Sequence, residues 1–239
     1  DHSKRLHNSA RIMGFEIPFT VEQLEAAKRE ALAKSGLESA YIRAIAWRGS
    51  EMMGVSAQNN TIHLAVAVWS WGDYFADKMK GIRMTHAEWR RPAPDTAPCH
   101  AKAAGLYMIC TLSKHAAEKA GYADALMLDY RGQVAEATGA NIFFVRDGAL
   151  HTPTPDCFLN GLTRQTAIKL AEARQIEVIE RAIMPDELAT FSECFITGSA
   201  AEITPVAEIG AHTYKPAEIS HSLVDDYTKL VNGKMELAL

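Results

Sequence analysis

Apolar positions in the first part of the chain recur first at helical spacing and then in strand-like runs. Leu6, Ala10 and Met13 recur at helical spacing, which predicts a short helix over residues 3–14. Thr20 and Gln23 form a capping-box pattern, in which each side chain satisfies a backbone amide at a helix start. The apolar positions that follow keep helical spacing until residue 36, a glycine, which predicts a second helix ending there.

Strand-like runs come next. Residues 41–47 read as a strand followed by a turn at 48–50, and residues 61–69 read as a second, more uniformly apolar strand. That uniformity predicts that the second strand is buried on both faces. We place a domain boundary behind it, with a small domain over residues 1–73, an interdomain loop over 74–80 and a large domain over 81–239.

The remainder mixes helical and alternating patterns. Helices are predicted over residues 104–120, from Gly161 through Ala171, over 185–188 and over 216–231. Strands are predicted over residues 82–89, 125–129, 133–136, 141–146, 149–152, 176–183 and 193–197. Mixed helices and hairpins of this kind predict an α/β protein with two domains.

Composition and charge narrow the functional class. The 239 residues are 48% hydrophobic and 23% charged with a net charge of −4, a globular composition that favours neither nucleic acid nor an anionic membrane as partner. The longest apolar runs are too short to span a bilayer. Four cysteines without metal-ligand spacing predict free thiols in a reducing cytoplasm and no metal site. Because Asp1 follows neither an initiator methionine nor a signal peptide, we expect the sequence to begin inside a longer protein.

Candidate chemistry concentrates between residues 102 and 141. Lys102 precedes Gly105 and therefore lies near the start of a predicted helix, and Tyr107 follows on that helix. Glu136 sits in a small-residue stretch that leads into an apolar strand, where a carboxylate needs a specific partner. Taken singly, a lysine or a glutamate is usually a solvated surface charge.

Six short motifs in a fixed order change that interpretation. They are RLHNSA at 5–10, YIR at 41–43, KAAGLY at 102–107, EATGAN at 136–141, GLTR at 161–164 and GSAAEITPV at 198–206. Their order and spacing over essentially the whole chain resemble the class IV pyridoxal-phosphate aminotransferases, in particular the branched-chain amino-acid aminotransferases. The resemblance implies a fold type IV α/β (α+β) enzyme, with a small N-terminal domain and a larger, barrel-like mixed domain. It also implies that the first part of the family's small domain lies upstream of Asp1.

The resemblance assigns the residues that meet the reactive end of pyridoxal 5′-phosphate. This cofactor draws electrons from the substrate Cα into a protonated pyridine ring. Lys102 matches the lysine that forms the Schiff base and shuttles the proton, and Glu136 matches the carboxylate that keeps the ring nitrogen protonated. Tyr107 matches the tyrosine that hydrogen-bonds the phenolic oxygen, with a core aromatic as the alternative. Leu106 departs from the family, because relatives often have asparagine there.

The phosphate group has its own set of matches. Arg5 matches the phosphate arginine, whose guanidinium suits a phosphate. Leu162 and Thr163 open the helix after Gly161, so their amides can face the phosphate, and Ser199 adds a hydroxyl or an amide.

Substrate residues follow from the same resemblance. Tyr41 and Arg43 face one side of a strand and match residues that bind the substrate carboxylate, and the amides of Ser199 and Ala200 are further candidates. Trp71 and Tyr74 are either walls of an apolar pocket or core aromatics. Val55 matches a position that in the family reaches into the neighbouring subunit's site, which predicts a homodimer or a higher homo-oligomer.

The expected activity is transfer of the amino group of L-leucine, L-isoleucine or L-valine to 2-oxoglutarate in a ping-pong cycle, within branched-chain amino-acid metabolism. The first alternative is a D-amino-acid aminotransferase or an aminodeoxychorismate-lyase-type enzyme on the same fold. The second alternative is a non-catalytic α/β protein. The intact lysine, carboxylate and arginine argue against the non-catalytic alternative, because buried charges without a role are unfavourable.

Overall fold

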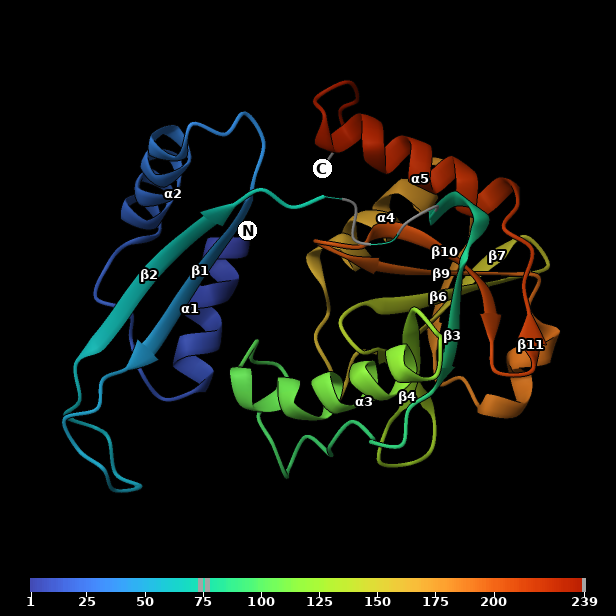
Figure 1. The fold of residues 1–239 in the computed structure, drawn as a ribbon. Helices are drawn as coiled ribbons and strands as arrows, with labels where there is room; N and C mark the ends of the chain where they lie inside the picture. Colours follow the sequence, from blue (N-terminus) through green and yellow to red (C-terminus); the bar gives the residue numbers. More distant parts are fainter. Residues whose placement is uncertain (73–74, 76–77, 238–239) are drawn as a thin grey trace. The chain divides into compact units, whose positions relative to one another are not determined.

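The computed structural model describes residues 1–72, 75 and 78–237, which form two compact units that we describe separately (Figure 1). The first unit comprises Asp1–Tyr74 and His100–Ala103, and the second comprises Phe75–Cys99 and Ala104–Leu239. The segment that carries Lys102 therefore groups with the first unit, whereas the sequence-based boundaries place it in the large domain. The polar and apolar pattern holds no signal for this return of the chain.

The first unit is a two-stranded antiparallel sheet with two helices. It contains α1 (His2–Ile12), α2 (Val21–Ser35), β1 (Tyr41–Arg48) and β2 (Ile62–Trp69). The predicted capping box is present at the start of α2, where the amide of Gln23 donates to Thr20 Oγ1 and the amide of Thr20 donates to Gln23 Oε1. Both helices contact the sheet.

The prediction that the second strand is buried on both faces is wrong. Ile62, Leu64 and Val66 are half-buried, whereas His63 and Ala65 between them are exposed. Among the described residues the sheet of this unit has only the strands β1 and β2, and the alternation shows that its helices cover one face. Small alanine side chains made the exposed face look apolar in the sequence.

The second unit is built on a nine-stranded mixed sheet with the order β5-β4-β3-β10-β9-β6-β7-β8, and β11 pairs with β10. Its strands are β3 (Ile82–His86), β4 (Asp124–Leu128), β5 (Val134–Ala137), β6 (Asn141–Arg146), β7 (Ala149–Pro153), β8 (Val178–Arg181), β9 (Glu193–Gly198), β10 (Glu202–Ile209) and β11 (His212–Thr213). Its helices are α3 (Tyr107–Lys119), α4 (Leu162–Ala173) and α5 (Glu218–Val231), with 3₁₀ turns at Lys78–Lys80, Ala104–Leu106 and Pro185–Thr190. A two-unit α/β fold agrees with the predicted class.

Two apolar clusters cover opposite faces of this sheet. Alternate residues of β6 and β9, such as Phe144 and Ile196, belong to one cluster, and Phe143 and Phe195 belong to the other, which α4 and α5 complete. The rings of Phe143 and Phe195 stack with their centroids 4.9 Å apart. Asn141 and Thr197 are paired across β6 and β9 two residues further along. They therefore share the face that carries α4 and α5.

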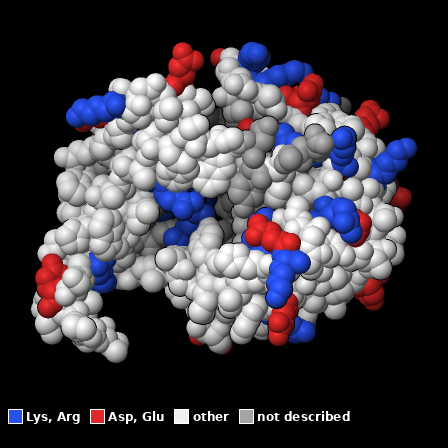
Figure 2. All heavy atoms as spheres, in the orientation of Figure 1, with Lys and Arg blue, Asp and Glu red and all other residues white. Residues whose placement is uncertain are grey.

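Acidic and basic side chains are interspersed over the second unit in the face shown in Figure 2. The ion pairs of this unit include Arg83–Glu208 and Lys229–Asp225. Within the described residues, none of the helices combines the length and the apolar character that crossing a membrane requires.

Candidate active site

In the first unit, Lys102 lies against α1. Its backbone amide donates to the buried hydroxyl of Ser9 at 3.0 Å. One turn earlier on α1, Arg5 Nη2 lies 3.3 Å from His2 Nδ1. Partial desolvation of the ring lowers the pKa of His2 to about 4, with further lowering by the charges of Arg5, Lys28 and Lys102, although the residue as a whole is exposed. The structure thus brings Lys102 and Arg5 into one cationic neighbourhood, which suits an anionic ligand.

The structure also brings together predicted substrate residues of this unit. The Tyr41 ring lies 5.2 Å from Trp69 and 4.6 Å from Trp71, measured between ring centroids. The guanidinium carbon of Arg43 lies 5.6 Å and 5.7 Å from the centroids of Tyr41 and Trp69. Trp71 is 39% exposed, so it is not a core aromatic, and Tyr74 lies outside the described residues.

Trp69 is a member of this aromatic cluster that sequence reasoning missed. The available signal was the strand register, because Trp69 is the cross-strand partner of Tyr41. Cross-strand aromatic pairs on one face of a sheet interact directly.

Val55 lies in the loop between β1 and β2 and is fully exposed, as is the neighbouring Met53. In Figure 1 this loop extends beyond the strands that it joins. Two fully exposed apolar side chains on one loop agree with the expectation that the loop contacts another molecule.

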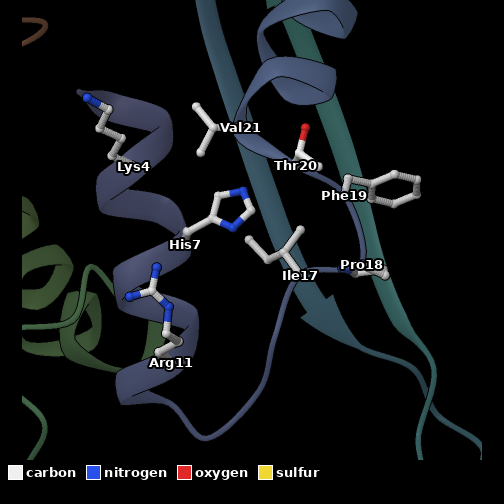
Figure 3. A pocket seen from close by; sticks show the side chains of 8 residues that line it. All are labelled: Lys4, His7, Arg11, Ile17, Pro18, Phe19, Thr20 and Val21. Carbon is white, nitrogen blue, oxygen red and sulfur yellow. The ribbon is translucent and has the colours of Figure 1, made fainter.

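A hollow of about 370 Å³ lies elsewhere on α1 (Figure 3). Lys4, His7 and Arg11 line it from one face of α1, opposite residues 17–21. It contains none of the predicted site residues.

In the second unit, Glu136 on β5 is held by two neighbours. Its side chain is only 12% exposed, and Oε1 lies 3.4 Å from Nε of Arg91. Its other oxygen, Oε2, accepts a hydrogen bond from Asn141 Nδ2 at 3.3 Å. The sequence motif at 136–141 ends at Asn141 without giving it a role, and Arg91 carries no motif, because both contacts with Glu136 arise only in the folded unit.

Asn141 also fixes the start of α4. Its Oδ1 accepts from the amide of Gly161 at 3.1 Å, and its Nδ2 donates to the carbonyl of Leu159 at 2.9 Å. Gly161 is the N-cap of α4, which has no side-chain cap and no acidic residue in its first turn. The first amides of α4, at Leu162 and Thr163, therefore suit an anion.

A buried arginine in the first turn of α4 ties this helix to neighbouring segments. Arg164 is 1% exposed and donates to the carbonyl of Pro153 at 3.1 Å, to Asn160 at 2.9 Å and to Glu180 at 2.6 Å. These contacts fix the first turn of α4 to the end of β7 and to β8.

The turn after β9 carries Ser199 and Ala200. A Cβ at Gly198 would lie 3.3 Å from the carbonyl oxygen of Gly139, so the backbone passes closely there. The hydroxyl of Thr197 is buried and has no hydrogen-bond partner among the described residues. Tyr107, the first residue of α3, is 38% exposed, which argues against the core-aromatic alternative.

Asp129, Asp156 and Cys157 form a cluster with potential metal-ligand atoms within 4.8 Å of one another. Arg131 already pairs with Asp129 at 2.6 Å and with Asp156 at 2.7 Å. Burial, together with the charges of Asp156 and Asp129, raises the pKa of Cys157 to about 12. We interpret this cluster as an ion pair built around Arg131.

Comparison with known proteins gives concordant matches in sequence and structure. A family model described as "Amino-transferase class IV" matches residues 1–209. The branched-chain-amino-acid aminotransferase of Pseudomonas aeruginosa is 38% identical, with 98% of this chain and 78% of that protein covered. The Escherichia coli K12 enzyme of the same name is 37% identical, with 87% and 69% covered.

Solved structures extend the likeness to the fold. The branched-chain aminotransferase from Thermoproteus uzoniensis with norvaline has a TM-score of 0.95 at 35% identity, covering 99% of this chain and 80% of that one. The T.th. branched-chain amino acid aminotransferase complexed with N-(5′-phosphopyridoxyl)-L-glutamate has a TM-score of 0.93 at 36% identity, covering 98% and 78%.

Proposed function

Because the chain belongs to the class IV aminotransferase family, we propose that it is a pyridoxal-phosphate-dependent branched-chain amino-acid aminotransferase. It would move the amino group of L-leucine, L-isoleucine or L-valine to 2-oxoglutarate. The observation that carries this proposal is the match over nearly the whole chain to enzymes of that name, one of which is complexed with N-(5′-phosphopyridoxyl)-L-glutamate.

The residues of the second unit fit the cofactor. When bound, pyridoxal 5′-phosphate supplies an electron-withdrawing ring for the transfer of the amino group. A buried carboxylate at Glu136 suits a protonated ring nitrogen, because an opposite charge favours the protonated form. The start of α4, which lacks a side-chain cap, suits the phosphate through the amides of Leu162 and Thr163. The Thr197 hydroxyl, without a partner among the described residues, marks a buried polar position on the same face of the sheet.

Further roles are proposed from the motifs. Lys102 would attach the cofactor covalently, and its freed Nζ would carry the proton between the substrate Cα and the cofactor C4′ carbon. Tyr107 would donate to the phenolic oxygen. Arg5 and Ser199 would bind the phosphate with the α4 amides. A helix terminus contributes only about 0.3–2 kcal/mol, so the arginine must supply much of the affinity for the phosphate.

Substrate recognition is assigned to the aromatic cluster of the first unit and the turn after β9. Tyr41 and Arg43, with the amides of Ser199 and Ala200, would bind carboxylates. The contact of the Arg43 guanidinium with two aromatic rings holds it in a defined position, and such contacts contribute about 0.5–2 kcal/mol. Trp71 and Tyr74 would wall the apolar part of the pocket.

We also propose a cytoplasmic homodimer or higher homo-oligomer, in which Val55 enters the neighbouring subunit's site. The fully exposed loop supports the oligomer, and four free, buried cysteines suit a reducing compartment.

A colour assay tests the proposed function. The purified protein, incubated with pyridoxal 5′-phosphate and desalted, should be yellow and should bleach when L-glutamate is added. L-Leucine with 2-oxoglutarate should then give glutamate faster than D-alanine does. A colourless protein would favour the non-catalytic alternative, and a preference for D-alanine would favour the D-amino-acid enzyme.

Replacement of Lys102 tests the catalytic assignment. Lys102→Ala should lose the visible absorbance of the bound cofactor and turnover, because no amine remains to attach the cofactor or carry the proton. The control is Lys119→Ala, which removes an exposed lysine at the end of α3 and should retain both. Absorbance spectra and coupled glutamate assays report both quantities, and an active Lys102→Ala would refute the assignment.

A further inference from the structure

Arg91 is a buried arginine that the proposed reaction does not yet use. Its side chain is 4% exposed, and its backbone is fixed by an amide hydrogen bond to the carbonyl of Leu128 at 2.8 Å. Nε lies 3.4 Å from Oε1 of Glu136, and Nη1 lies 3.4 Å from Sγ of Cys110 on α3. Backbone and guanidinium are thus both held, with the charge directed at one carboxylate.

The neighbouring acidic groups have cations of their own. Asp129, which forms a β-bridge with Arg91, pairs with Arg131, as does Asp156. Asp124 on β4 lies 3.7 Å from Lys114 and accepts a hydrogen bond from Thr138. These carboxylates are therefore paired with cations other than Arg91.

The neighbouring thiols are neutral at physiological pH. Cys99 and Cys110 both sense the charges of Arg91 and Glu136, but burial raises the pKa of each thiol above its usual value. Neither thiol competes with Glu136 as an anionic partner for Arg91.

We propose that Arg91 is a positioning residue that keeps Glu136 ionised and oriented, an inference that rests on the proposed role of Glu136 at the cofactor ring nitrogen. A buried carboxylate without a cation tends to take up a proton, and a neutral acid cannot stabilise a protonated ring nitrogen by charge. Among the described residues, Arg91 forms an ion pair with Oε1 without a hydrogen bond from Nε, while Asn141 Nδ2 hydrogen-bonds Oε2, so each oxygen of the carboxylate has a neighbour of its own. A carboxylate has about four acceptor positions, more than these two contacts use.

The test uses the cofactor-free protein, so that it does not depend on catalysis. The side-chain carboxyl carbons of glutamate are labelled with ¹³C, and the signal of Glu136 is identified by its loss in Glu136→Gln. In Arg91→Met, Glu136 should bind a proton roughly 10- to 1000-fold more tightly than in the wild type, the range expected for removal of an adjacent opposite charge. Arg91→Lys, which retains the charge, should stay closer to the wild type.

The matched control is Arg131→Met, which removes another carboxylate-paired arginine and should leave the titration of Glu136 unchanged. If Arg91→Met does not fold, Arg91→Gln takes its place, because it removes the charge and retains a hydrogen-bond donor. A purely structural role would lower the melting temperature without moving this titration. An unchanged titration of Glu136 in the charge-removing variant would overturn the proposal.

The two hypotheses fail in distinguishable ways. If the wild-type protein binds pyridoxal 5′-phosphate but Glu136 titrates alike with and without Arg91, the positioning role fails and the proposed function stands. If Glu136 shifts as expected but the wild-type protein takes up no cofactor, the proposed function fails while the charge coupling of the two residues stands. In the loaded enzyme, Arg91→Met should also bind the cofactor at least about tenfold more weakly than Arg91→Lys, since one unit of pKa corresponds to a factor of ten.

Discussion

Asn141 shows at the scale of single residues how one side chain restricts another. A Cβ built at Gly161 would lie 2.4 Å from Asn141 Oδ1, which is far inside the contact distance. The same oxygen accepts the amide of Gly161, so the amide group cannot move away without losing a hydrogen bond. The closeness of Asn141 Oδ1 therefore requires glycine at position 161. Its backbone angle does not, because a φ of −61° is open to any residue.

We therefore predict that Gly161→Ala lowers the free energy of unfolding by about 1–3 kcal/mol, the usual effect of overpacking. Combining it with Asn141→Ala should recover part of the loss, with a coupling of about 0.5 kcal/mol or more. Gly105→Ala is the control, because no atom lies within 4 Å of a Cβ there. Denaturant unfolding followed by circular dichroism measures these three variants and Asn141→Ala alone, and strict additivity would contradict the steric explanation.

His2 gives a prediction about pH at the same scale. Its pKa is about 4 in the folded protein and about 6.5 when unfolded, so between these values only the unfolded chain binds the proton. Stability attributable to neutral His2 should be complete above pH 6.5 and should fall as the pH drops towards 4. His2→Gln should slightly flatten the decline of the melting temperature across this window, whereas His221→Gln, on α5 and away from the cations around His2, should not. Parallel curves for His2→Gln and the wild type would contradict this account.

Helix α5 illustrates a cap supplied from another element. The carboxylate of Glu193 at the start of β9 is 5% exposed and accepts from the amides of Ala217 and Ser220 at 3.0 Å and 2.9 Å, and from the Ser220 hydroxyl at 2.6 Å. An anion at this position satisfies amides that the helix leaves unpaired. It also fixes α5 to the sheet.

Glu193→Gln should lower the free energy of unfolding by about 1–3 kcal/mol, because a neutral amide replaces a buried, charge-assisted acceptor. Glu218→Gln, an exposed change in the first turn of α5, should stay within about 0.5 kcal/mol of the wild type. Urea titrations of the three proteins give the comparison. Equal losses in the two variants would assign the effect to the helix dipole alone.

Elements with local signals were predictable from the sequence. The capping box of α2 and the predicted strands over 141–146 and 149–152, which pair as the hairpin of β6 and β7, are confirmed, because residues close in sequence determine them. Strand β10 was missed, although it lies inside the sheet between β3 and β9. It contains Pro205 and a register shift between Val206 and Glu208, and such features usually mark an edge strand or a loop.

At the scale of the whole molecule, Val55 predicts a dependence on assembly. If the loop enters another subunit, Val55→Asp should weaken the dimer by about 10- to 100-fold, because an unpaired polar group becomes buried. The melting temperature of the variant should change little, since Val55 is fully exposed within its own chain. Light scattering coupled to gel filtration, over a range of concentrations, measures the association.

The control is Val231→Asp at the exposed end of α5, which should leave the association unchanged. A Val55→Asp protein that dimerises like the wild type would remove the loop from the interface.

The candidate site was predictable where function rests on a motif and unpredictable where it rests on packing. Lys102 and Glu136 stand in recognisable stretches, and their roles remain proposals derived from them. Arg91 belongs to no motif, and Trp69 could be found only through the pairing of two strands, because each acquires its importance from a neighbour distant in sequence. A single sequence does not encode such pairs locally.

The two-stranded sheet of the first unit affects how readily its exposed side chains can be substituted. Its strands pair only with each other in the described structure, whereas β9 and β10 are enclosed by further strands of a nine-stranded sheet. Side chains on the exposed face of β1, Arg43 among them, can therefore change with little penalty to the larger fold. If Arg43 binds substrate as proposed, substrate preference can change by substitutions on this face, while the carboxylate and the helix start that would serve the cofactor lie in a sheet enclosed by further strands.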